Sequence, residues 1–162
     1  MKTFKKILSF SIIVSVAFFS CGKKSDVSPS GSTSSSSWTI AGNNYNSTTT
    51  AFTNNELLGV DQKVSTEPNI GIQFNATPAA GTYTIVNQYN ATVGNGQCSI
   101  LESIGNTVYV SDNGGTVTVT FSNGKITASF KNIAMGILSA VNNNGTFEFV
   151  SAGTSTGTLT EQ

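Results

Sequence analysis

The chain contains two cysteines, Cys21 and Cys98, and no histidine. Without an imidazole group there is no Ser–His or Cys–His catalytic pair, and the commonest general base and metal ligand are missing. Cys98 lies close to Ile100 and Leu101, and no neighbouring lysine or arginine is present to lower the pKa of its thiol. We therefore expect Cys98 to be a buried small hydrophobic residue, and we expect the protein not to be an enzyme.

Carboxylates are the other groups that could do chemistry. They form one loose cluster and three isolated positions: Glu56, Asp61, Glu67, Glu102, Asp112 and Glu148. A glycosidase needs two carboxyl groups across a sugar bond, but we interpret these acids as solvated surface charges. The segment Ser111–Gly114 offers oxygen atoms without a second acid at calcium-loop spacing, so it predicts a turn. We expect no metal and no cofactor.

Aromatic rings could instead stack on sugars, and four of them are candidates. Tyr109 falls on the polar side of its predicted strand, and Tyr89 is a second candidate. Trp38 and Tyr45 belong to the first predicted strands, and we expect Trp38 to fill one end of the core. Tyr109 and Tyr89 are therefore the predicted ligand-binding residues.

Residues 1–20 have the layout of a secretory signal peptide. Three early lysines are followed by an apolar segment of 13 residues, Ile7 to Phe19, and then by Ser20 and Cys21. A helix needs about 20 apolar residues to cross a bilayer, so this segment is too short to span one. We expect the leader to be removed.

The end of the leader, Phe18-Phe19-Ser20-Cys21, resembles the lipobox of bacterial lipoproteins. It matches at Ser20 and Cys21 and departs at Phe18 and Phe19, where a branched aliphatic and then a smaller residue are more usual. Leaders ending in Phe-Ser-Cys look like those of Bacteroidota lipoproteins. The resemblance implies cleavage before Cys21, acylation of its thiol and attachment to the outer membrane, on the periplasmic face or the cell surface. An ordinary secreted protein cut nearby is the alternative.

The mature chain divides into a tether and one domain. Residues 21–37 are rich in serine and predict a flexible tether that carries the lipidated Cys21. Residues 38–162 are enough for a single domain with a core. After Cys21 the chain has five lysines, eight acids and no arginine, a net charge of about −3, which excludes a typical nucleic-acid binder.

Alternation of apolar and polar residues with period two recurs through the domain and predicts antiparallel strands. In segment 107–111 we expect Val108 and Val110 to face the core and Tyr109 to face solvent. We expect further strands at 38–41, 45–52, 57–60, 70–74, 82–85, 97–102, 116–121, 126–130, 147–149 and 156–160. Nine to eleven short strands predict an all-β fold, either an antiparallel sandwich or a flattened up-and-down barrel.

The pair Asn123-Gly124 predicts a two-residue hairpin loop, because both positions of a type I′ turn need positive φ. This register places Ser122 opposite Lys125 and matches apolar partners farther along the two strands: Phe121 with Ile126, Val119 with Ala128, and Val117 with Phe130. By the same reasoning the loop Asp112–Gly115 would pair Val110 with Val117, which predicts a three-stranded meander.

The apolar side changes from even-numbered to odd-numbered positions after Phe130. A β-bulge near Lys131 and Asn132 would explain this change, and a short helix over residues 133–141 is the alternative. The segment Asn142–Gly145 predicts a turn.

Three segments, Trp38–Tyr45, Gly81–Thr84 and Gly157–Thr160, look like those of small Bacteroidota lipoproteins of unknown function. In these, a hairpin with Trp and Tyr opens a β-only domain, and no active site is known. We therefore expect a lipid-anchored envelope lipoprotein with a non-enzymatic β domain that binds carbohydrate or polymer. Its partners would be the membrane, through Cys21, and a glycan or an envelope protein. The alternative is a structural or protein-interaction domain that pairs through an exposed strand edge.

Overall fold

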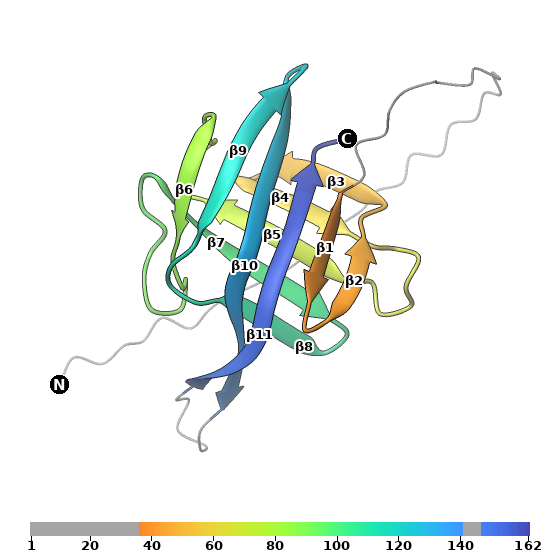
Figure 1. Cartoon of the computed structure of the whole chain (residues 1–162), viewed down its shortest axis with the longest axis vertical. Helices are drawn as coiled ribbons and strands as arrows, with labels where there is room; N and C mark the ends of the chain where they lie inside the picture. Colours follow the sequence, from red (N-terminus) through yellow and green to blue (C-terminus); the bar gives the residue numbers. More distant parts are fainter. Residues whose placement is uncertain (1–35, 141–146) are drawn as a thin grey trace. The chain divides into compact units, whose positions relative to one another are not determined.

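The computed structural model describes residues 36–140 and 147–162 of the chain. All regular secondary structure in these residues is β-strand, as predicted (Figure 1). The strands are β1 Ser37–Ile40, β2 Asn43–Asn46, β3 Thr49–Thr53, β4 Glu56–Val60, β5 Asn69–Phe74, β6 Gly81–Ile85, β7 Gln97–Ile104, β8 Thr107–Ser111, β9 Thr116–Ser122, β10 Lys125–Ala140 and β11 Phe147–Thr160.

The strands pair into one sheet that folds into two layers (Figure 1). Layer 1 has the spatial order β2-β1-β11-β10-β9-β6, and layer 2 has the order β3-β4-β5-β7-β8. The layers are joined where β6 pairs in parallel with β7, and where the second half of β10 pairs with β8. These two junctions close a ring of pairings through β10, β9, β6, β7 and β8, and both a sandwich and a flattened barrel describe this arrangement.

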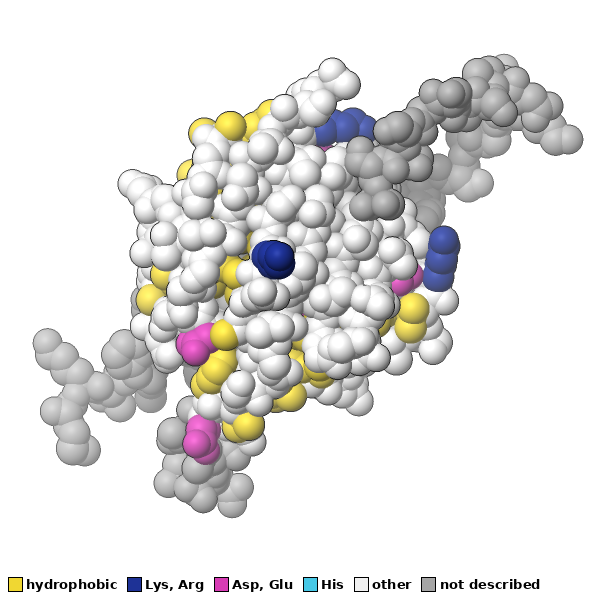
Figure 2. Space-filling model, viewed as in Figure 1, with side chains coloured by type: hydrophobic (Ala, Val, Ile, Leu, Met, Phe, Trp, Pro, Cys, Tyr) yellow, Lys and Arg dark blue, Asp and Glu magenta, His cyan; other side chains and the backbone are white. Residues whose placement is uncertain are grey.

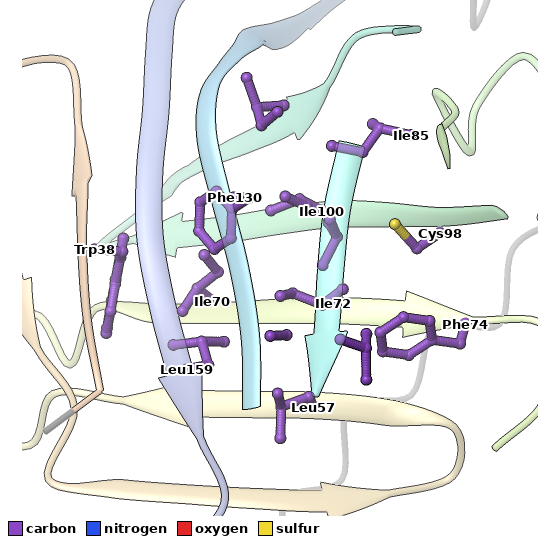
Figure 3. Close-up of a cluster of buried hydrophobic side chains, with 14 of the residues drawn as sticks. Trp38, Leu57, Ile70, Ile72, Phe74, Ile85, Cys98, Ile100, Phe130 and Leu159 are labelled. Atoms are coloured by element: carbon purple, nitrogen blue, oxygen red, sulfur yellow. The ribbon is translucent and has the colours of Figure 1, made fainter. Parts of the chain in front are cut away.

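The hydrophobic core lies between the layers. Figure 3 shows Trp38, Phe130 and Leu159 of layer 1 facing a cluster from layer 2: Leu57, Ile70, Ile72 and Ile100. These side chains are at most 4% exposed. Burying each one contributes roughly 1.5–3 kcal/mol relative to an exposed position, so this contact between layers is the main source of stability.

The hairpin at Asn123-Gly124 has the predicted register. Asn123 and Gly124 have φ of 54° and 77°, and Ser122 lies opposite Lys125. The apolar pairs farther along the strands also meet as predicted. Phe121 is nevertheless 44% exposed, because the hairpin extends past the end of the core (Figure 1).

The predicted β-bulge is also present. The pairing of β10 with β11 shifts register between Phe130 and Ile133, and Asn132 has a φ of 53°. The alternative of a helix over residues 133–141 is wrong for its described part, since β10 continues as a strand to Ala140. The bulge lets β10 leave layer 1 and pair with β8 in layer 2.

The predicted meander is wrong, because β8 does not pair with β9. The neighbours of β8 are β7 and β10, and those of β9 are β10 and β6. The loop Asp112–Gly115 therefore crosses between layers instead of closing a hairpin. Its backbone is held by bonds from the Asp112 N–H to the Ala134 carbonyl and from the Gly114 N–H to the Ile85 carbonyl.

The single strand predicted over residues 45–52 is two strands. β2 belongs to layer 1 and β3 to layer 2, and the chain changes layer at Ser47 and Thr48. The hydroxyls of both residues bond the Val60 carbonyl at 3.2 Å, and the Thr48 backbone N–H bonds the same carbonyl at 2.8 Å, so this corner is held against β4. The predicted turn at 142–145 lies outside the described residues.

Candidate functional site

The outward face of layer 1 is covered by hydroxyl and amide side chains. Cross-strand partners in a sheet share one face, and alternate residues of each strand point away from the core. The pairing registers therefore place one row of six polar side chains across the whole layer: Asn46, Ser37, Thr158, Ser129, Thr118 and Thr82. We call this outward surface the threonine face.

Two further rows flank the first. One consists of Thr160, Thr127 and Thr120, which are cross-strand partners in β11, β10 and β9. The other contains Asn44, Thr39 and Thr156 toward the β2 edge, and Thr116 and Thr84 toward the β6 edge. Threonine suits this exposed sheet because its branched carbon packs on the pleat while its hydroxyl reaches solvent.

Hydrogen bonds between neighbouring strands hold several of these hydroxyls in place. Ser129 and Thr158 bond through their hydroxyls at 3.1 Å, and the Thr127 hydroxyl donates to that of Thr160 at 3.1 Å. The Thr156 hydroxyl accepts a bond from the Asn132 backbone N–H at 2.9 Å and so stabilises the bulge. A hydroxyl offers one donor and two acceptor positions, so each bonded pair keeps capacity for a ligand.

A shallow groove of about 700 Å³ lies on this face and crosses β2, β1, β11, β10 and β9. Nine of its fourteen lining residues are Ser, Thr or Asn, and Lys131 carries the only charge among them. Figure 2 shows the same character: the middle of the visible face is uncharged apart from one lysine near its centre, and the other charged side chains lie toward the rim. Ligand sites commonly occupy 300–1,000 Å³, so this groove is large enough to hold a ligand.

The predicted ligand-binding tyrosines do not lie in this groove. Tyr109 pairs with Glu102 and packs partly buried against the core, whereas Val108 is 39% exposed. The expectation is therefore wrong for Val108 and Tyr109, because Tyr109 lies opposite the buried Glu102 of β7. Val110 is buried, as expected. Tyr89 is 47% exposed in the loop between β6 and β7, away from the groove lining.

Trp38 and Tyr45 form a stacked pair where β1 meets β2, with ring centroids 5.5 Å apart. Trp38 is 1% exposed and belongs to the core, as predicted, so its ring is not free to stack on a sugar. Gly157 lies opposite Trp38, and a Cβ there would come within 2.7 Å of the Trp38 Cβ and 2.8 Å of the Phe130 ring. Glycine is required at this position because a side chain would overlap the Trp38 Cβ, the Phe130 ring and the Ser37 carbonyl oxygen.

Cys98 is fully buried in β7, as predicted. Burial raises the pKa of its thiol to about 12, so the sulfur stays protonated and unreactive at neutral pH. Asp61 is also buried, so the expectation of a solvated surface charge is wrong for it, and it accepts bonds from the backbone N–H groups of Asn46 and Lys63, each at 3.1 Å. It acts as a structural residue at the corner between the layers.

Glu102 is not the surface charge that we expected, because its side chain is 0% exposed between the layers. The Ser155 hydroxyl of β11 donates to Glu102 Oε1 at 2.5 Å, and Oε2 has no hydrogen-bond partner among the described residues. Burial raises the pKa of the carboxyl to about 8, although the bond from Ser155 lowers it. The sequence contains one indication of this burial, since Glu102 alternates in phase with the core residues Cys98 and Ile100.

Tyr45 and Tyr109 are the titratable neighbours of this carboxyl. The pKa of Tyr45 is raised by burial first, and then by the charges of Tyr109 and Glu102. The indole N–H of Trp38 is a second buried polar group without a partner in the described part of the chain. Two buried polar atoms therefore lack a hydrogen-bond partner in the described residues, namely Glu102 Oε2 and the indole nitrogen of Trp38.

The remaining predicted sites are placed as follows. Cys21 lies outside the described residues. Residues 36–140 and 147–162 contain no group of three or more Cys, Asp or Glu side chains arranged to hold a metal ion. In the same residues no helix is long and apolar enough to cross a membrane. The terminal strands of the sheet order, β2 and β3, have only four and five residues, and short edge strands are a common way to limit edge pairing. Among the described strands, a longer unpaired edge lies on β11 over residues 147–154, because its pairing with β1 begins at Ser155.

Three comparisons test whether the chain is similar to known proteins. No family model, no curated protein and no solved structure gives a significant match to it.

Proposed function

We propose that this chain is a lipid-anchored lipoprotein of the bacterial envelope, and that its β domain binds carbohydrate or a similar hydroxyl-rich polymer without catalysis. The anchor is supported by the leader: a basic start, a short apolar segment and a small residue before Cys21. More than one acyl chain is needed for stable attachment, because each buried CH₂ contributes only about 0.8 kcal/mol. The serine-rich tether would then let the domain reach a polymer near the membrane.

The groove on the threonine face is the observation that carries the binding proposal. It gathers hydroxyl and amide groups from five adjacent strands onto one surface of a rigid layer. Sites on strands hold their groups more firmly than sites on loops, so less conformational entropy is lost on binding. The exposed loop residue Tyr89 lacks such support.

The binding proposal is tested by co-sedimentation of the full chain with insoluble polysaccharides. Retention on at least one polysaccharide, and its loss when soluble fragments of the same polymer compete, supports the proposal. A chain that remains in the supernatant with every polysaccharide contradicts it. A chain that instead captures a defined envelope protein through β2 or β3 would favour the interaction alternative.

The anchor is tested separately by the intact mass of the mature protein. We expect a chain that begins at Cys21 and carries the added mass of acyl groups. An uncut chain, or a trimmed chain without acyl groups, would contradict the anchor and leave the binding proposal standing.

A further inference from the structure

We propose that the ligand of the threonine face is a neutral polysaccharide, and that its chain lies across the strands along the row from Asn46 to Thr118. This inference rests on the proposed function and adds to it the class of polymer and the direction of binding.

The charge of the groove favours a neutral ligand. Lys131 is the only charged residue of the lining, which contains no carboxylate. A polyanion is held by several cations along its length, and one lysine cannot supply such a set. A polycation would need carboxylates, which the lining does not offer. Hydroxyl and amide groups donate and accept hydrogen bonds equally well, which suits the hydroxyls of an uncharged sugar.

The geometry of the row favours an extended chain. Neighbouring strands are about 4.8 Å apart, so five strands carry the groove over roughly 19 Å. Hydroxyl-bearing side chains repeat at this spacing, and the bond between Ser129 and Thr158 lies along the same direction. An extended sugar chain also presents hydroxyls at regular intervals, so several units can bond the row at once. The sum of such weak contacts gives affinity that no single residue supplies.

A protein partner fits this surface less well. Protein interfaces are centred on buried aromatic or aliphatic side chains surrounded by a polar rim. The exposed large hydrophobic residues of the described chain are Val64, Tyr89, Val108, Phe121 and Val150, and none of them lines the groove. The lining does include Trp38, Tyr45 and Phe130, but Trp38 and Phe130 are at most 4% exposed. The groove therefore offers no large exposed apolar side chain at its centre on which a protein would dock.

The chain provides a matched pair of variants for a test. Thr118 and Thr120 are both exposed residues of β9 on the same face, one row apart, and only Thr118 lines the groove. Replacing either residue by valine removes one hydroxyl and keeps the branched carbon that suits a strand. Equal melting temperatures for both variants and the unaltered chain show that folding is preserved.

Affinity electrophoresis of the full chain measures binding to neutral soluble polysaccharides, namely β-glucan, xylan, mannan and dextran, with alginate and polygalacturonate as anionic probes. We expect retardation by at least one neutral polymer and none by the anionic ones. Thr118→Val should weaken this binding roughly threefold to tenfold, the value of one hydrogen bond, and Thr120→Val should leave it unchanged. Because no ion pair is involved, added salt should have little effect.

Each other outcome overturns a defined part of the reasoning. Binding to anionic polymers alone, lost in added salt, would overturn the neutral class and leave the proposed function standing. If the Thr118→Val variant and a Thr158→Val variant both bind the neutral polymer as strongly as the unaltered chain does, the placement of the ligand on this row would be overturned. Absence of binding to every polysaccharide would overturn the proposed function together with this inference.

Discussion

Replacing Glu102 by glutamine should remove a pH dependence of stability that the buried carboxyl creates. The carboxyl is enclosed between the layers and bonded only to Ser155 among the described residues. Its pKa is about 8 in the folded protein, against 4.5 for the free side chain. At pH values between 4.5 and about 8, Glu102 therefore keeps its proton in the folded chain and releases it in the unfolded chain.

The sign and size of the effect follow from proton linkage. The stabilisation is fully present below pH 4.5 and is lost as the pH rises toward about 8. Within this interval the free energy of unfolding falls by about 1.4 kcal/mol for each pH unit. Over the whole interval the free energy of unfolding falls by at most about 5 kcal/mol. Local opening that hydrates the carboxylate makes the actual fall smaller.

The assay is urea unfolding from about pH 5 to about pH 9, followed by the fluorescence of Trp38, the only tryptophan in the chain. Glu102→Gln keeps the shape of the side chain but cannot ionise, so its free energy of unfolding should decline less with pH than that of the unaltered chain. Burial also raises the pKa of Glu56, but this contribution is present in both chains and cancels.

Glu148→Gln is the matched control, because Glu148 is an exposed strand residue. This variant should follow the unaltered chain at every pH. Parallel curves for the unaltered chain and Glu102→Gln over the whole range would refute the reasoning, since they would mean that Glu102 has the same pKa in the folded and unfolded states.

Three further predictions concern packing and backbone. Gly157→Ala should lower the free energy of unfolding by about 2 kcal/mol, measured in urea, because the new Cβ would overlap Trp38 and Phe130; an unchanged value would contradict this packing. Gly124→Ala should cost about 1 kcal/mol in the same assay, since Gly124 has a φ of 77°; no loss would mean that the turn differs. The Cys98 thiol should react with a thiol-specific reagent only after unfolding, and fast labelling of Cys98 itself in the folded chain would show that it is accessible.

Features set by neighbouring residues could be predicted from the sequence. The turn at Asn123-Gly124 and the register beside it were predicted because turn chemistry and apolar alternation agree over a few residues. The bulge near Asn132 was predicted because the apolar side of the strand changes there. In both cases the information lies within one hairpin or one strand.

Features set by which layer a strand joins could not be predicted in this way. The loop Asp112–Gly115 has the composition of a hairpin turn, yet it carries the chain from layer 2 to layer 1. The inward side of β8 follows from its pairing with β7, so the alternation of Val108 and Tyr109 alone gave the wrong side. The strands with which a strand pairs, which are distant in the sequence, decide which layer it joins and which of its sides faces the core.

The candidate site could be predicted only in part, because it also depends on which strands lie side by side. The threonine-rich strand faces could be recognised in the sequence, but their assembly into rows requires the order of β2, β1, β11, β10 and β9. Glu102 shares the phase of buried neighbours, but carboxylates are rarely buried, and the prediction of a surface charge followed residue type alone.

The central claim, that the threonine face is the binding surface, is tested most directly by NMR. Backbone amide signals of the isotope-labelled full chain would be followed during titration with a soluble neutral oligosaccharide that the protein binds. We predict that the largest shifts fall on Ser37, Thr118, Ser129 and Thr158, on four strands of layer 1. Shifts centred on Tyr89 or on β3, with these four residues unchanged, would contradict the account.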